Sequence, residues 1–391
     1  MSSTMLKTMK REWDKMIREK MIFIVILFIP FLVNILIGFE FSKNQIQNIS
    51  MAIYDQDNSS LSRMIAQQFA ENEIFHVNYY IDNSEQMKQL FDESHIRVGM
   101  IIPKNFSKDV AELKSPTIMM IYDGSHMSIA STAKSKASEI LLTLKTGILI
   151  KLIEGKLSLP ADVAEKMALS IKFSNRMLYN PAKSFKNFLN PGFSTAIVQT
   201  AIVLMGAVAI RTEEIEGGKR NRIGYYLGKA LFYSIMGGIS LIMSIWIQSN
   251  IFDIPFRGQM REAILLSFVL SMAVAVFSLT ISVWVKHEML ATQINAVLFI
   301  PNTIMVGYTW PLIAMPKPYQ ILGRLFPFYR YADNLRDMFL KGSSLSHMMK
   351  DIQWLIIYIA FVSFVGLLGM IFFRKTETEE LGKEMEAIVL S

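Results

Sequence analysis

The sequence contains no cysteine and only five histidines among its 391 residues. Without cysteine it can form no disulfide, no thiolate metal site and no cysteine nucleophile. The histidines do not recur at the spacing of metal ligands, and no serine or carboxylate constellation accompanies them. We therefore expect neither a catalytic residue nor a metal site. The five histidines are His76, His95, His126, His287 and His347.

The sequence also lacks a loop that could hold nucleotide phosphates. The stretch GYYLGKA, from Gly224 to Ala230, has the glycines and the lysine of such a loop. A P-loop, however, needs four residues between its glycines, a serine or threonine after the lysine and a strand before it. None of these is present, so we expect this chain to bind no cofactor, and any nucleotide chemistry must reside in another subunit.

Charge is scarce in this sequence. The residues are 52% hydrophobic and 19% charged, and the mean hydropathy of +0.32 is too apolar for an ordinary soluble protein. The net charge is +7, but basic and aromatic residues are not interleaved as they are on a nucleic-acid-binding surface. The composition predicts a membrane protein with one soluble insert, in contact with the lipid bilayer and without a nucleic-acid partner.

Six apolar segments have the roughly 20 residues that a spanning helix needs. The fifth contains Pro301, Asn302, Gly307 and Pro311, so it is either broken and partly re-entrant or a proline-kinked helix. The sequence thus predicts an α-helical polytopic membrane protein with six transmembrane helices, namely Met21–Phe39, Phe193–Ile210, Ala230–Phe252, Ala263–Val285, Met289–Met315 and Ile352–Phe373.

The interiors of these predicted spans carry no Asp, Glu, Lys or Arg. Ion-coupled carriers usually need ionisable groups at mid-membrane, so a secondary transporter is disfavoured. The uncharged polar side chains either form hydrogen bonds between helices or line a translocation path. Our candidates for that path are Asn34, Gln199, Asn295, Asn302 and Tyr308.

The residues before the first span predict an amphipathic helix. Its apolar residues recur at helical spacing, with basic residues around the rest of the wheel, which is typical of a helix lying on an anionic leaflet. A signal peptide is the alternative, but the apolar core is too long and no small-residue cleavage site follows. The apolar residues are Met5, Leu6, Met9, Trp13, Met16 and Ile17.

Basic residues predict the orientation. By the positive-inside rule the N-terminus is cytoplasmic, and six spans return the C-terminus, with Arg374 and Lys375, to the same side. The loop from Arg211 to Arg222 then falls inside as well. The segment from Lys317 to Lys350 is basic but comes out external, which conflicts with the rule.

Strands and helices are predicted to alternate between the first two spans. This alternation implies an α/β domain inserted on the outer side of the membrane. A long helix, Met127–Glu154, and a short one within LSLPADVAEKMALS then lead back to the membrane. The expected strands are Ile49–Tyr54, Phe75–Ile81, Arg97–Ile102 and Thr117–Tyr122, and the expected helices between them are Ser59–Glu71, Glu85–Phe91 and Phe106–Leu113.

With this layout the chain resembles an ABC type-2 transporter permease of the subgroup with a large extracytoplasmic domain after the first span. The resemblance extends over nearly the whole chain, and each motif alone is weak, but five occur in order. They are AIYDQDNSSLSR, VGMIIPKNFSKDV, IMMIYDGSHMSIAS, RMLYNPAKSFKNFLNPGF and MPKPYQILGRLFPFYRYADNLRDMFLKG.

The resemblance implies a role for each part of the chain. By this resemblance, residues 1–20 form a cytoplasmic elbow helix, residues 21–40 form the first transmembrane helix, and residues 41–190 form the extracytoplasmic α/β domain. Residues 191–374 form transmembrane helices 2–6, and they include a coupling loop at 211–226 and an external segment at 316–350. Residues 375–391 form a cytoplasmic tail. The loop is shorter than is usual in the family. The implied elbow residues are Met9, Trp13, Met16 and Ile17, and the implied coupling residues are Arg211, Glu213, Glu214, Glu216, Gly217, Gly218, Lys219, Arg220 and Arg222.

The resemblance also implies a function. The chain would be the permease subunit of an ABC exporter in the bacterial cytoplasmic membrane, moving an amphipathic or hydrophobic molecule such as a drug, a lipid or a polyketide. A separate cytoplasmic ABC ATPase would bind ATP and Mg and hydrolyse the ATP. A second permease copy or a paralogue would complete a dimer. The alternatives are a membrane-anchored sensor with a ligand-binding outer domain and an envelope scaffold.

Overall fold

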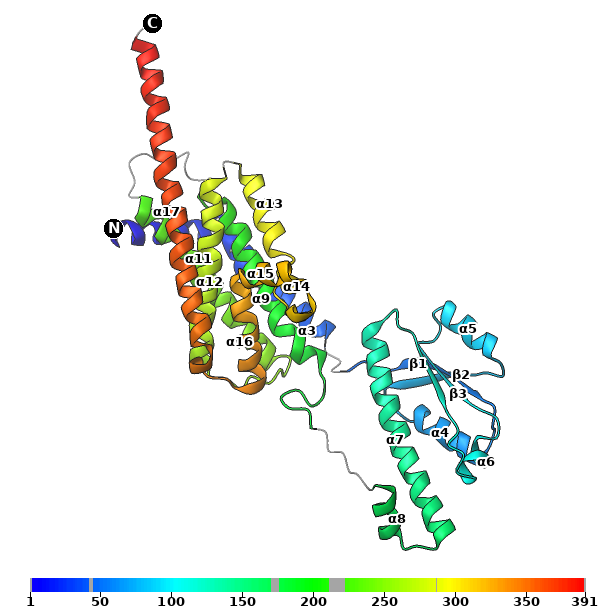
Figure 1. Cartoon of the computed structure of the whole chain (residues 1–391). Helices are drawn as coiled ribbons and strands as arrows, with labels where there is room; N and C mark the ends of the chain where they lie inside the picture. Colours follow the sequence, from blue (N-terminus) through cyan, green and yellow to red (C-terminus); the bar gives the residue numbers. More distant parts are fainter. Residues whose placement is uncertain (1, 42–44, 170–175, 211–221, 286, 390–391) are drawn as a thin grey trace. The chain divides into compact units, whose positions relative to one another are not determined.

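The computed structural model describes residues 2–41, 45–169, 176–210, 222–285 and 287–389. The chain divides into two compact units (Figure 1). We call Met1–Asn44 with Met177–Ser391 the membrane unit, and Gln45–Arg176 the α/β unit.

The α/β unit contains one four-stranded sheet with the strand order β2-β1-β3-β4. β1 pairs in parallel with β2 and with β3, whereas β3 and β4 are antiparallel. All seven predicted elements are confirmed, with ends within a few residues of the prediction. The strands are β1 (Ile49–Asp55), β2 (Phe75–Tyr80), β3 (Val98–Ile102) and β4 (Met119–Tyr122), and the helices are α4 (Ser60–Ala70), α5 (Ser84–Asp92) and α6 (Phe106–Ala111).

Side chains of β1 alternate between two cores, as the period of a strand requires. Met51 and Ile53 enter the core that α4 covers, and Ala52 enters the core on the side of α5. Both faces of the central strands β1 and β3 are therefore largely buried, which explains why these two strands are mostly apolar, whereas the edge strand β2 alternates buried and exposed residues. The long helix α7 (Met127–Leu157) packs Ala133 and Ala137 into the first core and is followed by α8 (Ala161–Ala168).

Local hydrogen bonds fix the turns of this unit. The Asp55 carboxylate accepts the backbone N–H groups of Asp57 and Asn58 at 3.0 and 3.1 Å, which closes the turn after β1. Ser59 then caps α4 in a reciprocal box with Ser62. At the end of β4, hydrogen bonds from Ser125 and from the paired Arg97 lower the pKa of Asp123 to about 2.

Among the described residues, the membrane unit has five helices that are long and apolar enough to cross a membrane. They overlap five of the six predicted spans, and the chain is a mostly helical membrane protein with a small sheet. The five are Met21–Glu40, which comprises α2 (Met21–Phe23), η1 (Ile24–Phe28) and α3 (Ile29–Glu40), α9 (Phe185–Val208), α11 (Arg222–Asn250), α12 (Met260–Trp284) and Leu345–Phe372 of α17 (Leu345–Val389).

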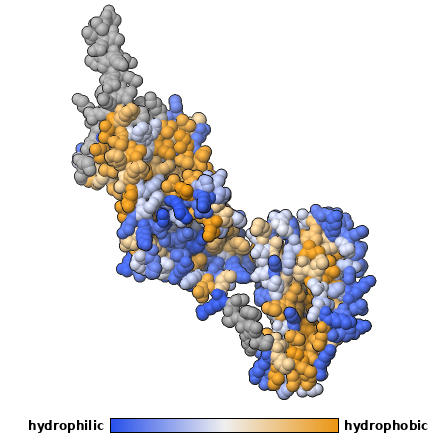
Figure 2. Space-filling view, viewed as in Figure 1, coloured by the Kyte–Doolittle hydropathy of each residue, from blue (hydrophilic) through white to orange (hydrophobic). Residues whose placement is uncertain are grey.

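These helices form an inner and an outer group. The apolar windows of α9, α11 and α12 are 67% buried within the unit, whereas those of Met21–Glu40 and Leu345–Phe372 are only 28% buried. The outer helices therefore present apolar side chains away from the bundle, and hydrophobic residues cover much of its visible surface (Figure 2). Such a surface suits contact with lipid or with another apolar helix.

The fifth predicted span is broken, and the structure does not confirm a sixth span. α13 (Glu288–Phe299) has 12 residues and so measures about 18 Å, less than the roughly 30 Å of a hydrocarbon core. Pro301 interrupts the chain before α14 (Asn302–Met305), and Gly307 adopts a left-handed φ of 86°. A single kinked helix is therefore wrong. The segment continues through η2 (Leu312–Ala314), α15 (Lys317–Arg324) and α16 (Pro327–Lys341).

Two predicted boundaries differ from the division into units. The α/β unit ends at Arg176 instead of residue 190, because α9 begins at Phe185 and packs within the membrane unit. Helix α1 (Ser2–Glu19), predicted as a region of its own, belongs to the membrane unit because it packs along α11. In Figure 1, α1 runs across the bundle.

Candidate functional site

Tyr308 joins the broken fifth segment, which comprises α13, α14 and η2 and which we call the broken segment, to α9. Its side chain is buried, and its hydroxyl donates to the Phe188 carbonyl oxygen at 2.8 Å and accepts the Gly192 N–H at 2.9 Å. In a regular helix the N–H of residue 192 bonds to the carbonyl of residue 188. The hydroxyl therefore stands between two groups of the α9 ladder, next to Pro191, which has no N–H to contribute. Insertion of a side chain into the ladder is a recognised cause of helix bending.

Gly192 is required by this arrangement. A Cβ atom at this position would lie 2.1 Å from the Tyr308 ring. No side chain other than hydrogen fits there while the tyrosine keeps its place.

Arg336 of α16 locks the same junction. Its guanidinium carbon lies 3.9 Å from the ring centre of Tyr308 and 4.2 Å from that of Phe188. Its Nη2 also donates to the Tyr308 carbonyl oxygen at 2.9 Å. Cation–π contacts of this kind gain strength where water is excluded. The junction of Tyr308, Phe188, Gly192 and Arg336, which we call the tyrosine junction, therefore holds α9, α16 and the broken segment together.

The five predicted path residues are all buried in the membrane unit, with exposed fractions of at most 2%. Asn34 behaves as the alternative interpretation predicted, because its Nδ2 donates to Ser244 Oγ at 2.9 Å and so links α3 to α11. The other four lie on α9 or on the broken segment that packs against it.

Several side-chain amides on α9 and the broken segment lack some or all of their hydrogen-bond partners among the described residues. Neither polar side-chain atom of Gln199 or Asn302 has a hydrogen-bond partner among the described residues, and the same is true of Asn190, which the sequence analysis did not single out. Asn295 donates only to Ala291 of its own helix, and its Oδ1 has no partner there. Each unsatisfied buried group costs about 1–3 kcal/mol. These amides form a polar interior that the packing alone does not require.

The described helices are longer than the predicted spans, and the extensions carry buried charges. Lys186 of α9, Lys229 of α11 and Glu262 of α12 are 9%, 0% and 8% exposed. Lys229 forms an ion pair with Glu12 of α1, which is 1% exposed, and its Nζ lies 5.2 Å from the ring centre of Tyr225. This pair fastens α1 to α11.

The elbow residues divide between two environments. Met16 is buried and Met9 packs against the bundle core, whereas Trp13 and Ile17 are 47% and 58% exposed. The sequence analysis missed Glu12 because it followed only apolar residues. The signal was its position three residues after Met9 and four before Met16, on the face that packs.

Most of the predicted coupling residues lie outside the described residues. These are the eight from Arg211 to Arg220 named above. Arg222 is the first residue of α11, and its Nη1 donates to the Met370 carbonyl oxygen of α17 at 2.8 Å. The first turns of α11 are thus attached to α17 as well as to α1.

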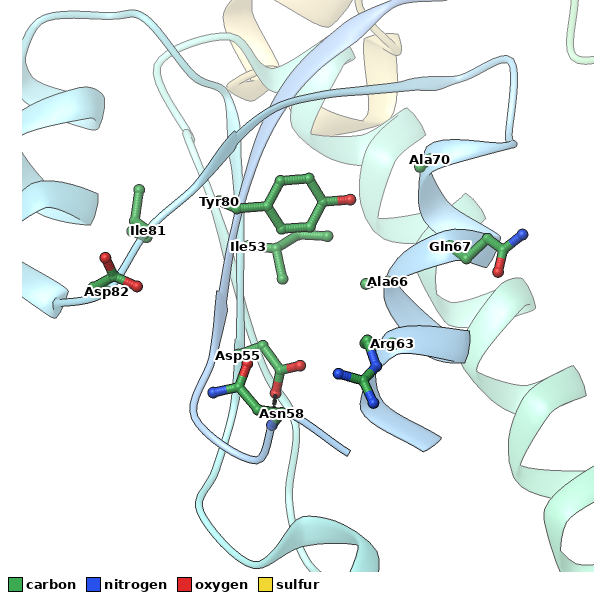
Figure 3. A pocket seen from close by; sticks show the side chains of 10 residues that line it. All are labelled: Ile53, Asp55, Asn58, Arg63, Ala66, Gln67, Ala70, Tyr80, Ile81 and Asp82. Carbon is green, nitrogen blue, oxygen red and sulfur yellow. Dashed lines mark hydrogen bonds between the residues drawn. The ribbon is translucent and has the colours of Figure 1, made fainter. Parts of the chain in front are cut away.

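A polar cavity of about 460 Å³ lies in the α/β unit, at the ends of β1 and β2 that precede α4 and α5 (Figure 3). Arg63 of α4 faces Asp55 across it, and Tyr80 lies on the strand side. Both Asp55 carboxylate oxygens, however, already accept hydrogen bonds from the turn and from Ser62. Asp55 therefore serves the fold of the turn and of α4. Across the described ranges, no three His, Asp or Glu side chains group as metal ligands.

The fold and these junctions define a class of protein. It is a polytopic helical membrane protein with an inserted α/β unit, a helix fastened across the bundle and a polar interior beside a broken helix. A family model described as ABC-2 family transporter protein matches residues 20–368. The chain belongs to this family, and the predicted resemblance to ABC type-2 transporter permeases is confirmed.

Two relatives show how far the similarity extends. The "Probable multidrug ABC transporter permease YbhR" of Escherichia coli strain K12 is 22% identical over 357 residues, which cover 88% of this chain and 90% of the relative. The "ABC transporter G family member 20" of Dictyostelium discoideum is 21% identical over 381 residues, which cover 92% of this chain and 50% of the relative.

Proposed function

We propose that the chain is the permease subunit of an ATP-driven exporter that moves an amphipathic or hydrophobic molecule out across the bacterial cytoplasmic membrane. The observation that carries the proposal is the family match over residues 20–368, together with the five apolar helices found in the described part of the chain. A relative named as a multidrug permease supports the cargo class. ATP and Mg would be held by a separate cytoplasmic ATPase, since this sequence has no P-loop.

The translocation path is proposed to run along α9 and the broken segment. Unsatisfied amides on these elements support this, because polar groups without partners are rare in a packed interior. Such groups are expected where a water-filled cavity opens during the transport cycle. The tyrosine junction holds the broken segment to α9. In this proposal the described state is closed, and export requires α9 and the broken segment to separate.

The ATPase is proposed to act through α1 and α11. Force applied to the loop before α11 reaches α1 through the Glu12–Lys229 pair and α17 through Arg222. Rigid-body movement of packed helices is one of the recognised ways in which such a transition is transmitted. A second permease copy would complete the path.

The test is purification of the chain in mild detergent from cells that express it with its genomic neighbours. We expect an ABC ATPase to copurify and the complex, reconstituted in proteoliposomes, to transport an amphipathic dye in an ATP-dependent manner. The chain alone should hydrolyse no ATP. Hydrolysis by the lone chain, or dye transport that is independent of ATP, would refute the division of labour.

Sidedness can be tested because the chain has no native cysteine. Gly124→Cys places a thiol in the α/β unit where a Cβ meets nothing within 4 Å. We expect a membrane-impermeant maleimide to label it on intact cells and to spare Lys10→Cys on α1 until the membrane is opened. The reverse pattern would invert the topology and exclude a cytoplasmic ATPase at the loop before α11.

A further inference from the structure

An apolar groove of about 600 Å³ opens in the α/β unit, away from the polar cavity of Figure 3. We call it the α7 groove. Hydrophobic residues also gather on the visible face of this unit along the second half of α7 (Figure 2). Its volume lies within the 300–1,000 Å³ typical of small-molecule sites. Its main walls are Phe106, Val110, Leu113, Leu144, Ile148 and Leu152.

The two walls are built from helix faces. Leu144, Ile148 and Leu152 follow one another at four-residue spacing on α7, so they share one face of that helix. Phe106 and Val110 have the same spacing on α6. Two regular apolar faces that leave a groove between them can receive a slender apolar chain.

One cation lines this groove. Lys145 is its sole charged lining residue, and it has no ion-pair partner among the described residues. The remaining polar lining residues, Ser115 and Thr117, are uncharged. A lysine in such a position can place its stem along apolar surface and its ammonium group at the rim. The groove is therefore complementary to an apolar chain that ends in an anionic group.

Leu113 gives an independent indication. It is the residue after the C-cap of α6, and its N–H bonds to the Val110 carbonyl while the Lys114 N–H bonds to the Asp109 carbonyl. This pair of bonds is the Schellman motif, whose left-handed position is usually glycine. Leu113 adopts φ 61° there and is 61% exposed. The strain places a large apolar side chain at the lip of the groove, where glycine would satisfy the backbone better.

We propose that the α7 groove binds a small single-chain amphiphile with an anionic head group, the chain lying between α6 and α7 and the head group beside Lys145. The proposal rests on the proposed function in one respect, since it names the class of molecule that such an exporter would handle in its outer unit. Binding itself needs neither ATP nor the partner ATPase.

The experiment uses the full chain in nanodiscs of phosphatidylcholine. The probe is a photoreactive long-chain carboxylate, compared with the alcohol and the amine of equal length, and labelled peptides are mapped by mass spectrometry. We expect label within residues 106–118 and 141–152. The carboxylate should bind about fivefold more tightly than the alcohol, which is the effect of one exposed charge pair, and the amine should bind least.

Variants separate binding from folding. Lys145→Gln should abolish the preference for the carboxylate over the alcohol, and Ile148→Asp should remove labelling. The matched control is Leu142→Asp on the same helix, because Leu142 is 65% exposed and does not line the groove. Leu113→Gly should keep or raise the melting temperature while it weakens labelling, a combination that a purely structural Leu113 would not produce.

Several results would overturn the proposal. They are labelling of the membrane unit alone, equal binding of carboxylate and alcohol, and unchanged labelling of Ile148→Asp. Competition by anionic phospholipid in the disc but not by free carboxylate would make the groove a membrane-surface contact instead. ATP-dependent transport of an uncharged dye tests the proposed function separately, so the two failures remain distinguishable.

Discussion

The two units of the molecule satisfy their polar side chains in different ways. In the α/β unit, Asp55, Ser59 and Asn83 direct their side chains to backbone N–H groups a few residues away. Some buried side-chain nitrogens and oxygens lack a hydrogen-bond partner among the described residues. All of these atoms, by contrast, lie in the membrane unit.

This difference separates a unit built for stability from one built for change. Local hydrogen bonds close the turns of the α/β unit at no cost elsewhere. An unsatisfied amide costs about 1–3 kcal/mol, so a bundle that holds several of them is less stable than its packing permits. Native proteins concentrate such violations at functional sites. The contrast predicts that loss of a polar partner is expensive in the membrane unit and mild in the α/β unit, where water can replace it.

The largest effect should come from Lys229→Ala. This change leaves the Glu12 carboxylate buried without its partner, and breaking a buried ion pair in this way costs about 3–5 kcal/mol. We expect a large loss of thermal stability, followed by tryptophan fluorescence in detergent. The double variant Glu12→Gln with Lys229→Met should recover most of the loss, because it removes both charges. A double variant as unstable as the single one would contradict a role for the charge.

Tyr308→Phe should have the next largest effect. The ring remains, but the Phe188 carbonyl and the Gly192 N–H lose the hydroxyl that they share, at a cost of about 1–3 kcal/mol. The same melting experiment measures it. Tyr319→Phe is the matched control, because Tyr319 is 57% exposed. Equal melting temperatures for both variants would mean that α9 closes its own ladder when the hydroxyl is absent.

Ser59→Ala tests the other side of the comparison. It removes the cap of α4, which typically costs about 1 kcal/mol. We expect faster hydrogen exchange confined to the first turn of α4 and no change in the membrane unit. Ser128→Ala, at an exposed position, provides the control. A loss as large as that of Tyr308→Phe would break the contrast between the units.

Asp123→Asn should have the smallest effect of the four changes, and that effect depends on pH. Hydrogen bonds from Ser125 and Arg97 depress the pKa of Asp123 from 3.8 to about 2, so the ionised group stabilises the folded α/β unit above pH 3.8. That contribution is lost as the pH falls through about 2. As the pH is lowered from 3.8 to about 2, pepsin cleavage of the α/β unit should therefore increase in the natural chain. It should increase less in the variant. An identical rise in both would exclude Asp123.

Much of the fold could be predicted from the sequence, because the relevant signals are local. Strand alternation, the Asp55 turn and the Ser59 cap place the elements of the α/β unit, and the length of apolar segments places five membrane helices. The break in the fifth segment could be predicted from Pro301 and Gly307. Whether the chain crosses there could not, because that depends on what packs against the break.

Less of the candidate site could be predicted from the sequence, since its contacts join distant parts of the chain. Tyr308 lies 116 residues from Gly192, and Lys229 lies 217 residues from Glu12. No periodicity within one helix encodes such a pair. The residues of the proposed path were nevertheless within reach, because an uncharged polar side chain in an apolar segment is conspicuous. Their partners, or lack of them, required the structure.

The tyrosine junction also constrains how this sequence can diverge. Any residue larger than glycine at 192 meets the ring of Tyr308, and any smaller residue at 308 leaves a void beside Pro191 and an unfilled place in the α9 ladder. A lineage that alters one position therefore passes through a damaged intermediate unless the other changes with it. Among descendants of a common ancestor, substitutions at positions 192 and 308 should therefore be correlated. A change at one position should be accompanied by a change at the other, although 115 residues separate them in the chain.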